Sequence, residues 1–99
     1  MSNDAYVLQF PPDYDTDEWI WTSKGYLPLE LEVGGTPPAR YSLTVFNPTR
    51  LAQDVDAELA DNSVFHEPNL LVVPTVDRRS IQRAIEVLAN RDFRGLVPE

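Results

Sequence analysis

The sequence predicts a single domain of the α/β (α+β) class: a two-layer fold with a mixed sheet of about four strands and two helices. Three observations support this. Residues 27–33 and 41–46 alternate apolar and polar side chains, which is typical of half-buried strands. Residues 70–73 are four consecutive apolar residues, which indicates a short central strand buried on both faces. Residues 77–90 carry an apolar stripe at helical spacing.

Length and composition set the limits of this domain. The chain has 99 residues, enough for one modest core, so we expect a single domain over residues 1–99. It has no cysteine, which removes disulfides, thiolate catalysis and cysteine-ligated metals. Residues 1–4 contain no basic residue or apolar run, so we expect no signal peptide. No apolar stretch approaches the ~20 residues needed to cross a bilayer. These features predict a cytoplasmic protein that does not contact membranes.

The first half of the chain supplies three of the expected strands. Residues 5–10 have strand composition and end at two prolines. Residues 13–18 are polar and acidic and predict a loop, and residues 19–21 predict a short extended segment or a turn of helix. Residues 27–33 and 41–46 should pair as an antiparallel hairpin across the turn at residues 34–38.

The first expected helix follows Asn47, a preferred N-cap, with Pro48 at the first helical position. Its apolar residues repeat at helical spacing, and residues 61–63 should end it. A strand-helix-strand crossover from 41–46 to 70–73 would make those two strands parallel.

The second expected helix is capped by Asp77 and stops at Asn90, and the apolar residues of the tail should dock on the body. The element order is then strand, strand, strand, helix, strand, helix. We expect the central core to contain Leu51, Val55, Leu59, Leu70, Val72, Ile81, Ile85 and Leu88.

The net charge is −8, from 16 acids and 8 bases. Residues 1–39 hold seven acids and one base, whereas residues 68–99 hold four acids and five arginines. An acidic chain repels nucleic acid and anionic membranes, so we expect it to bind neither. The acidity serves either solubility alone or attraction of a basic partner.

Asp13, Asp15 and Asp17 have the spacing that opens a calcium-binding EF-hand loop. The sixth position is Glu18 where glycine is needed, and the twelfth is Lys24 where a bidentate glutamate belongs. The pattern therefore favours a solvated acidic loop, and we assign no metal site and no cofactor.

His66 is the only histidine, and Glu67 follows it. A histidine and a carboxylate can act together as a general base, but adjacent residues of an extended segment point to opposite faces. No surrounding motif of a hydrolase or metalloprotease is present. A structural role for His66 is favoured.

Arg78, Arg79 and Arg83 lie in the first turns of the second expected helix. A helix N-terminus with guanidinium groups could hold an anion such as phosphate or carboxylate. Asp77 competes for the same backbone N–H groups, and the excess of carboxylates favours ion pairing with acids elsewhere in the chain. The arginines are therefore a weak candidate for anion binding.

One segment combines dense negative charge with large aromatic residues, the mixture that protein interfaces favour. The alternative is that its tryptophans cover the sheet and its acids keep the segment hydrated. The candidate partner-binding residues are Asp13, Tyr14, Asp15, Asp17, Glu18, Trp19 and Trp21.

Charge and the absence of a catalytic motif favour a non-enzymatic protein-interaction domain. Its concrete version is an inhibitor, or an immunity-type neutraliser, of a basic partner protein. The alternative is a small-molecule or divalent-cation binding protein, with its site near His66 or in the loop from Asp13 to Asp17. A pocket lined by His66 and several acids would favour the alternative, and a flat acidic-aromatic surface would favour the first hypothesis. No feature sets an oligomeric state.

Overall fold

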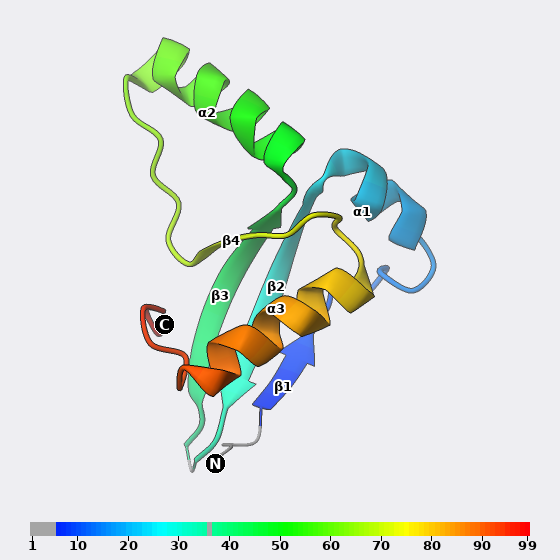
Figure 1. Ribbon diagram of the computed structural model, residues 1–99, viewed down its shortest axis with the longest axis vertical. Coiled ribbons are helices and arrows are strands. Elements are labelled where there is room, and N and C mark those ends of the chain that lie inside the picture. Colours follow the sequence, from blue (N-terminus) through cyan, green and yellow to red (C-terminus); the bar gives the residue numbers. More distant parts are fainter. Residues whose placement is uncertain (1–5, 36) are drawn as a thin grey trace.

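The computed structural model describes residues 6–35 and 37–99 (Figure 1). The predicted class is confirmed, because a mixed four-stranded sheet packs with helices in one α+β unit. The described residues form three helices where two were predicted. In chain order the elements are β1 (Tyr6–Gln9), α1 (Glu18–Lys24), β2 (Tyr26–Val33), β3 (Ala39–Phe46), α2 (Pro48–Asn62), β4 (Leu70–Val72) and α3 (Arg78–Asn90).

The sheet has the strand order β1-β2-β3-β4. β2 pairs antiparallel with β1 and with β3, which confirms the predicted hairpin, and β3 pairs parallel with β4, which confirms the predicted crossover. Ala5 of the first predicted strand, Thr36 of the predicted turn, and residues 1–4, on which the signal-peptide prediction rests, lie outside the described residues. Among the described residues, no helix has both the length and the apolar character required to cross a membrane.

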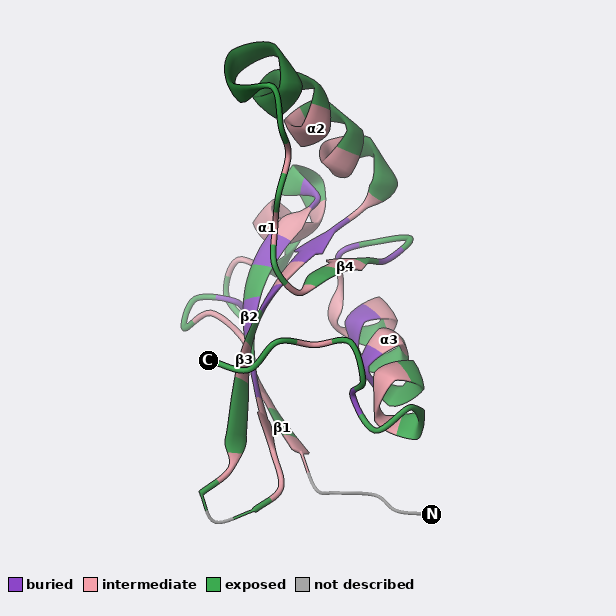
Figure 2. Cartoon of the chain, turned by 90° about the vertical axis from the view of Figure 1, so that its left-hand side faces the viewer, coloured by how far each residue is buried: buried purple, intermediate pink, exposed green. Residues whose placement is uncertain are grey.

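The core lies on one face of the sheet, beneath α3. Alternate residues of β2 and β3 point toward the core, and Ile81 and Ile85 of α3 pack against them from the opposite side. Figure 2 shows the buried residues concentrated between the sheet and this helix. The buried core residues are Tyr14, Leu27, Leu29, Leu31, Leu43, Val45, Val73, Val76, Ile81, Ile85 and Phe93.

Helix α2 differs from the prediction, which placed its apolar stripe in the core. None of its residues is buried, Leu51 and Val55 are only partly covered, and 49% of Leu59 is exposed. Figure 1 shows α2 extending past the end of the sheet, and residues 63–69 return from its far end to β4. The radius of gyration is 14.2 Å, above the ~13 Å typical of a compact chain of this length. The stripe is present, but no element among residues 6–35 and 37–99 covers it fully.

Strand β4 was predicted to be central and buried on both faces, and this is wrong. β4 is a three-residue edge strand that pairs only with β3. Leu71 packs against the core, whereas Leu70 and Val72 point to the opposite face and are exposed. They were therefore wrongly included in the predicted core. Leu88, also on that list, is half-buried and packs at the edge of the core.

Both helix N-caps follow the prediction. Asn47 Oδ1 accepts a hydrogen bond from the Arg50 N–H at 2.7 Å, and Asp77 Oδ1 accepts one from the Ser80 N–H at 2.8 Å. The predicted docking of the tail is also confirmed. The Val97 N–H donates to Asn69 Oδ1 at 2.7 Å.

Helix α1 forms where a loop and a short extended segment or turn of helix were expected. It is seven residues long and ends at Gly25, whose φ of 71° is left-handed. Because the segment is helical, Trp19 and Trp21 do not share a face as an extended chain would require. Trp19 is 70% exposed, whereas Trp21 packs against the core.

Candidate functional site

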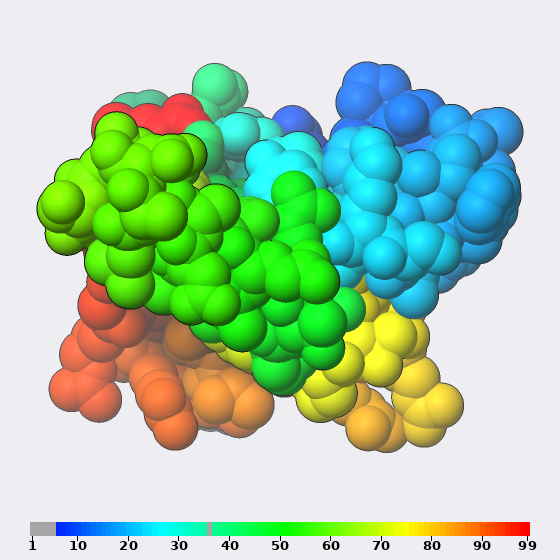
Figure 3. Space-filling view, turned by 90° about the horizontal axis from the view of Figure 1, so that it is seen from above, coloured from blue at the N-terminus to red at the C-terminus, as the bar shows by residue number. Residues whose placement is uncertain are grey.

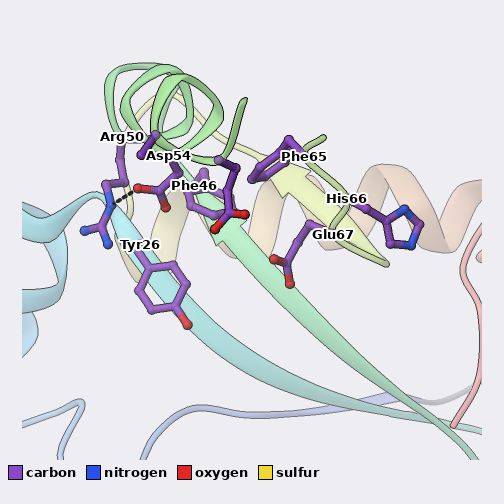
Figure 4. A pocket seen from close by; sticks show the side chains of 9 residues that line it. Tyr26, Phe46, Arg50, Asp54, Phe65, His66 and Glu67 are labelled. Atoms are coloured by element: carbon purple, nitrogen blue, oxygen red, sulfur yellow. Dashed lines mark hydrogen bonds and ion pairs between the residues drawn. The ribbon is translucent and has the colours of Figure 1, made fainter. Parts of the chain in front are cut away.

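A pocket of about 500 Å³ lies between α2, residues 65–67 and the ends of β2 and β3 that adjoin α2 (Figure 4). We call it the α2 pocket. Its aromatic lining residues are Tyr26, Phe46 and Phe65, and its acidic ones are Asp54, Glu58 and Glu67. Arg50, Ala57 and His66 complete the lining.

Strand register positions two of the aromatic rings. Tyr26 on β2 lies opposite Phe46 on β3, and the ring centroids are 5.5 Å apart. Phe46 is fully buried although it faces away from the α3 side of the sheet. The α2 pocket therefore has a hydrophobic wall fixed to the two central strands, which makes that wall rigid.

Arg50 and Asp54 form an ion pair one turn apart on α2, with 2.9 Å between Nε and Oδ1. The Arg50 guanidinium lies 5.3 Å from the centroid of the Tyr26 ring. Its NH1 also donates a hydrogen bond to the Lys24 carbonyl at 3.1 Å. The same side chain thus lines the α2 pocket and ties α2 to the end of α1.

The other two carboxylates have neutral partners. Glu58 accepts a hydrogen bond from the Asn62 side chain at 2.8 Å, and Glu67 accepts one from the Thr44 hydroxyl at 2.9 Å. The ion pairs among the described residues include neither glutamate. With His66 neutral, three carboxylates and one guanidinium give the α2 pocket a formal charge of −2.

His66 itself is exposed, and in Figure 4 its ring points away from the α2 pocket while Glu67 points into it. Side chains of consecutive residues in an extended segment point in opposite directions. His66 therefore lies at the edge of the α2 pocket. The aromatic rings and the carboxylates face the interior of the pocket. Such a lining attracts cations, because ring faces and carboxylate oxygens both carry negative potential.

The predicted partner-binding segment is divided between surface and core. Tyr14 is 1% exposed, its hydroxyl donates to Glu18 at 3.0 Å, and burial is the main cause that raises its pKa to about 12. Trp21 packs on the core, and its Nε1 is buried without a hydrogen-bond partner among the described residues. Asp17 is partly covered at the start of α1. The members left at the surface are Asp13, Asp15, Glu18 and Trp19.

The predicted anion site is not assembled around α3. Arg78 lies over the rings of Phe10 and Tyr14, 4.4 and 4.9 Å from their centroids, and pairs with Asp15 at 2.6 Å. Arg79 and Arg83 are exposed. The cap by Asp77 uses the backbone N–H of Ser80, a group an anion would need.

The three aspartates of the loop from Asp13 to Asp17 have different surroundings. Asp15 forms an ion pair with Arg78, and Asp17 lies at the start of α1. Across residues 6–35 and 37–99, no three His, Cys, Asp or Glu side chains are grouped closely enough to hold a metal ion.

Sequence reasoning missed most of the α2 pocket. Its residues come from β2, β3, α2 and residues 65–67, and the sequence signals within single segments are the adjacent His66 and Glu67 and the ion-pair spacing of Arg50 and Asp54. Comparison of the chain with known protein families, curated proteins and solved structures finds no match.

Proposed function

We propose that this protein is a non-enzymatic interaction domain that binds a basic partner protein. The observation that carries the proposal is the placement of charge. Residues 13–24 and 48–67, which we call the acidic head, hold nine of the 16 acids and two of the 8 bases. Their net charge of −7 is nearly the whole −8 of the chain.

The two parts of the acidic head are joined. The Asn47 N–H donates to the Gly25 carbonyl at 2.9 Å, and a Cβ on Gly25 would lie 2.6 Å from the Asn47 side chain. Seen from above, α2 in green and residues 13–24 in blue to cyan lie side by side (Figure 3). A concentrated negative field of this kind steers a basic partner and speeds its association.

Large apolar side chains are exposed between the acidic residues of the acidic head. Trp19, Leu59 and Val64 are exposed, the first on α1 and the others at the far end of α2. Exposed tryptophan surrounded by polar residues is a common energetic centre of interfaces. The concrete form of the proposal is an inhibitor, or immunity-type neutraliser, that covers the basic surface of its partner in the cytoplasm.

A charge-reversed variant tests the proposal. Asp56 and Asp61 are exposed on α2, and neither takes part in an ion pair among the described residues. A partner is first isolated with the wild-type protein, and its association rate with Asp56→Lys/Asp61→Lys is then measured at several salt concentrations. We expect a slower association, most clearly at low salt, with unchanged thermal stability.

The matched control is Glu86→Lys, because Glu86 is exposed on α3, outside the acidic head. The head variant changes the net charge by +4 and this control by +2, so a control loss of half the head variant's, in the logarithm of the association rate, would mean that only the total charge matters. Association of the head variant at the wild-type rate would remove the acidic head from the interface.

The second candidate function is binding of a small molecule or divalent cation, with the site near His66 or in the loop from Asp13 to Asp17. The α2 pocket favours it, since the pocket is lined by His66 and three acids, and its volume lies in the ~300–1,000 Å³ range of small-molecule sites. The loop from Asp13 to Asp17 should bind calcium no better than ~1 mM, because it lacks the turn glycine and the closing glutamate. Micromolar calcium binding in isothermal titration calorimetry would favour this second candidate.

A further inference from the structure

The α2 pocket contains two kinds of group that attract the same ligand. Phe65 is partly exposed and offers aromatic surface, with the buried Phe46 ring behind the lining, while Glu58 and Glu67 are carboxylates whose hydrogen-bond partners are neutral. Negative charge beside ring faces is the environment in which proteins hold organic cations. The small inorganic ions need several oxygen ligands around one point, and no such group is assembled here among the described residues.

The contacts of Arg50 show which kind of cation the lining of the α2 pocket can bind. Its guanidinium lies over the Tyr26 ring and pairs with Asp54, so one arginine of the chain itself uses an aromatic ring and a carboxylate of this pocket. A planar guanidinium stacks on rings and binds carboxylates with two parallel hydrogen bonds, which an ammonium cannot do. About 500 Å³ remains open beside Arg50, and its carboxylates keep the formal charge at −2.

We propose that the α2 pocket receives the guanidinium group of an arginine side chain that the basic partner presents. This inference rests on the proposed function and names the group that the acidic head recognises. A side chain within a peptide brings only its positive charge to the pocket. Free arginine adds an α-ammonium and an α-carboxylate whose charges cancel, whereas the chain on either side of a protein-borne arginine can make further contacts with the acidic head, so a protein-borne arginine is favoured over the free amino acid.

The first experiment uses a capped peptide, acetyl-Gly-Arg-Gly-amide, titrated into the protein and followed by nuclear magnetic resonance. We expect it to shift the aromatic resonances of Tyr26, Phe46 and Phe65. The control peptide has citrulline in place of arginine, which keeps the shape and removes the charge. Equal shifts with the citrulline peptide, or no shifts with the arginine peptide, would overturn the proposal.

The second experiment removes charge from the α2 pocket. In Glu58→Gln/Glu67→Gln the amide oxygens still accept the hydrogen bonds from Asn62 and Thr44, so the fold is kept. We expect the arginine peptide to bind ~10-fold more weakly, because two charge-assisted contacts are lost. The matched control is Asp56→Asn/Asp61→Asn, which removes the same charge from two exposed acids on α2 outside the pocket lining, with wild-type affinity expected.

A third measurement separates the possible sources of the guanidinium. Free arginine that binds as tightly as the capped peptide would assign the α2 pocket to a small molecule and overturn the protein-borne source.

Failure of this inference differs from failure of the proposed function. If Glu58→Gln/Glu67→Gln leaves the affinity of the isolated partner unchanged while Asp56→Lys/Asp61→Lys slows its association, the pocket inference is wrong and the interaction domain stands. If both variants behave as wild type with the partner, both proposals fail.

Discussion

Arg78 and Tyr14 hold the acidic residues 13–24 against the body of the molecule. Tyr14 is buried beside Phe10, the Arg78 guanidinium covers both rings, and Asp15 pairs with Arg78 from outside. These contacts fix the loop before α1 to the first turn of α3. Arg78, which the sequence offers for anion binding, thus holds the exposed acidic residues before α1 in a fixed position.

The raised pKa of Tyr14 makes stability depend on pH at the alkaline end. The unfolded phenol ionises near pH 10, while in the folded protein burial and the Glu18 carboxylate raise its pKa to about 12. The contribution of Tyr14 is therefore complete below pH 10 and is lost as the pH rises toward 12, at ~1.4 kcal/mol per pKa unit.

The measurement is the free energy of unfolding of the wild type and of Tyr14→Phe between pH 8 and 12. We expect the wild type to lose more stability over this range than the variant, which has no phenol to ionise at this position. Parallel curves for the two proteins would contradict the assignment.

Ile85 tests the core beneath α3. It is 0% exposed and packs among residues of β2 and β3. Ile85→Ala should lower the free energy of unfolding by ~2–5 kcal/mol in a urea titration, because it leaves a cavity. The control on the same helix is Val87→Ala, at a position that is 48% exposed, where the loss should stay below ~1 kcal/mol. Similar losses for both variants would mean that α3 does not cover the sheet as described.

At the scale of elements, α2 and α3 share the same pattern of capping and apolar residues but have different surroundings. Each has an Asx N-cap and an apolar stripe, yet α3 buries Ile81 and Ile85 while α2 buries nothing. Periodicity tells which residues share a face and cannot tell whether another element covers that face. The same reason explains β4: four apolar residues in a row fit a central strand, but the chain places it at an edge.

Local signals predicted the hairpin, the crossover and both caps, because these depend on neighbouring residues and on turn chemistry. Helix α1 was only partly predicted, since Trp19, Ile20 and Trp21 have higher strand than helix propensity and the helix is short. A site near His66 was one of the alternatives, but the aromatic lining of the α2 pocket was not predicted, because it forms only when residues 46–67 fold back and Tyr26 of β2 meets them at the end of the sheet.

Helix α2 should open more readily than the rest of the fold. Its capping hydrogen bond and the contacts of Arg50 hold its first turn, but no residue along its length is buried. Amide hydrogen exchange should therefore be much faster in the middle of α2, near Val55, than in the middle of α3, near Ile85. Amides of β2 and β3 are the internal reference for global unfolding. Equal protection of the two helices would show that α2 is covered in solution.

On the scale of the whole molecule, most of the negative charge lies at one end of an elongated body. The acidic head occupies the end from which α2 projects, while the remainder of the chain holds seven acids and six bases and is nearly neutral. The principal extents of 42, 32 and 21 Å describe an elongated body with its charge at one end. Two copies of such a molecule repel one another when their acidic heads approach.

Self-association should therefore increase with salt. At ~0.02 M salt the charge of −7 on each acidic head keeps two heads apart, so sedimentation velocity should show a monomer. At ~0.5 M salt the repulsion is screened, and the exposed Leu59 and Val64 near the tip of α2 can bring two copies together weakly. Leu59→Ser should abolish this high-salt association without changing the low-salt result. A low-salt dimer that Leu59→Ser abolishes would contradict the placement of the charge, because it would form through the acidic head against its own repulsion.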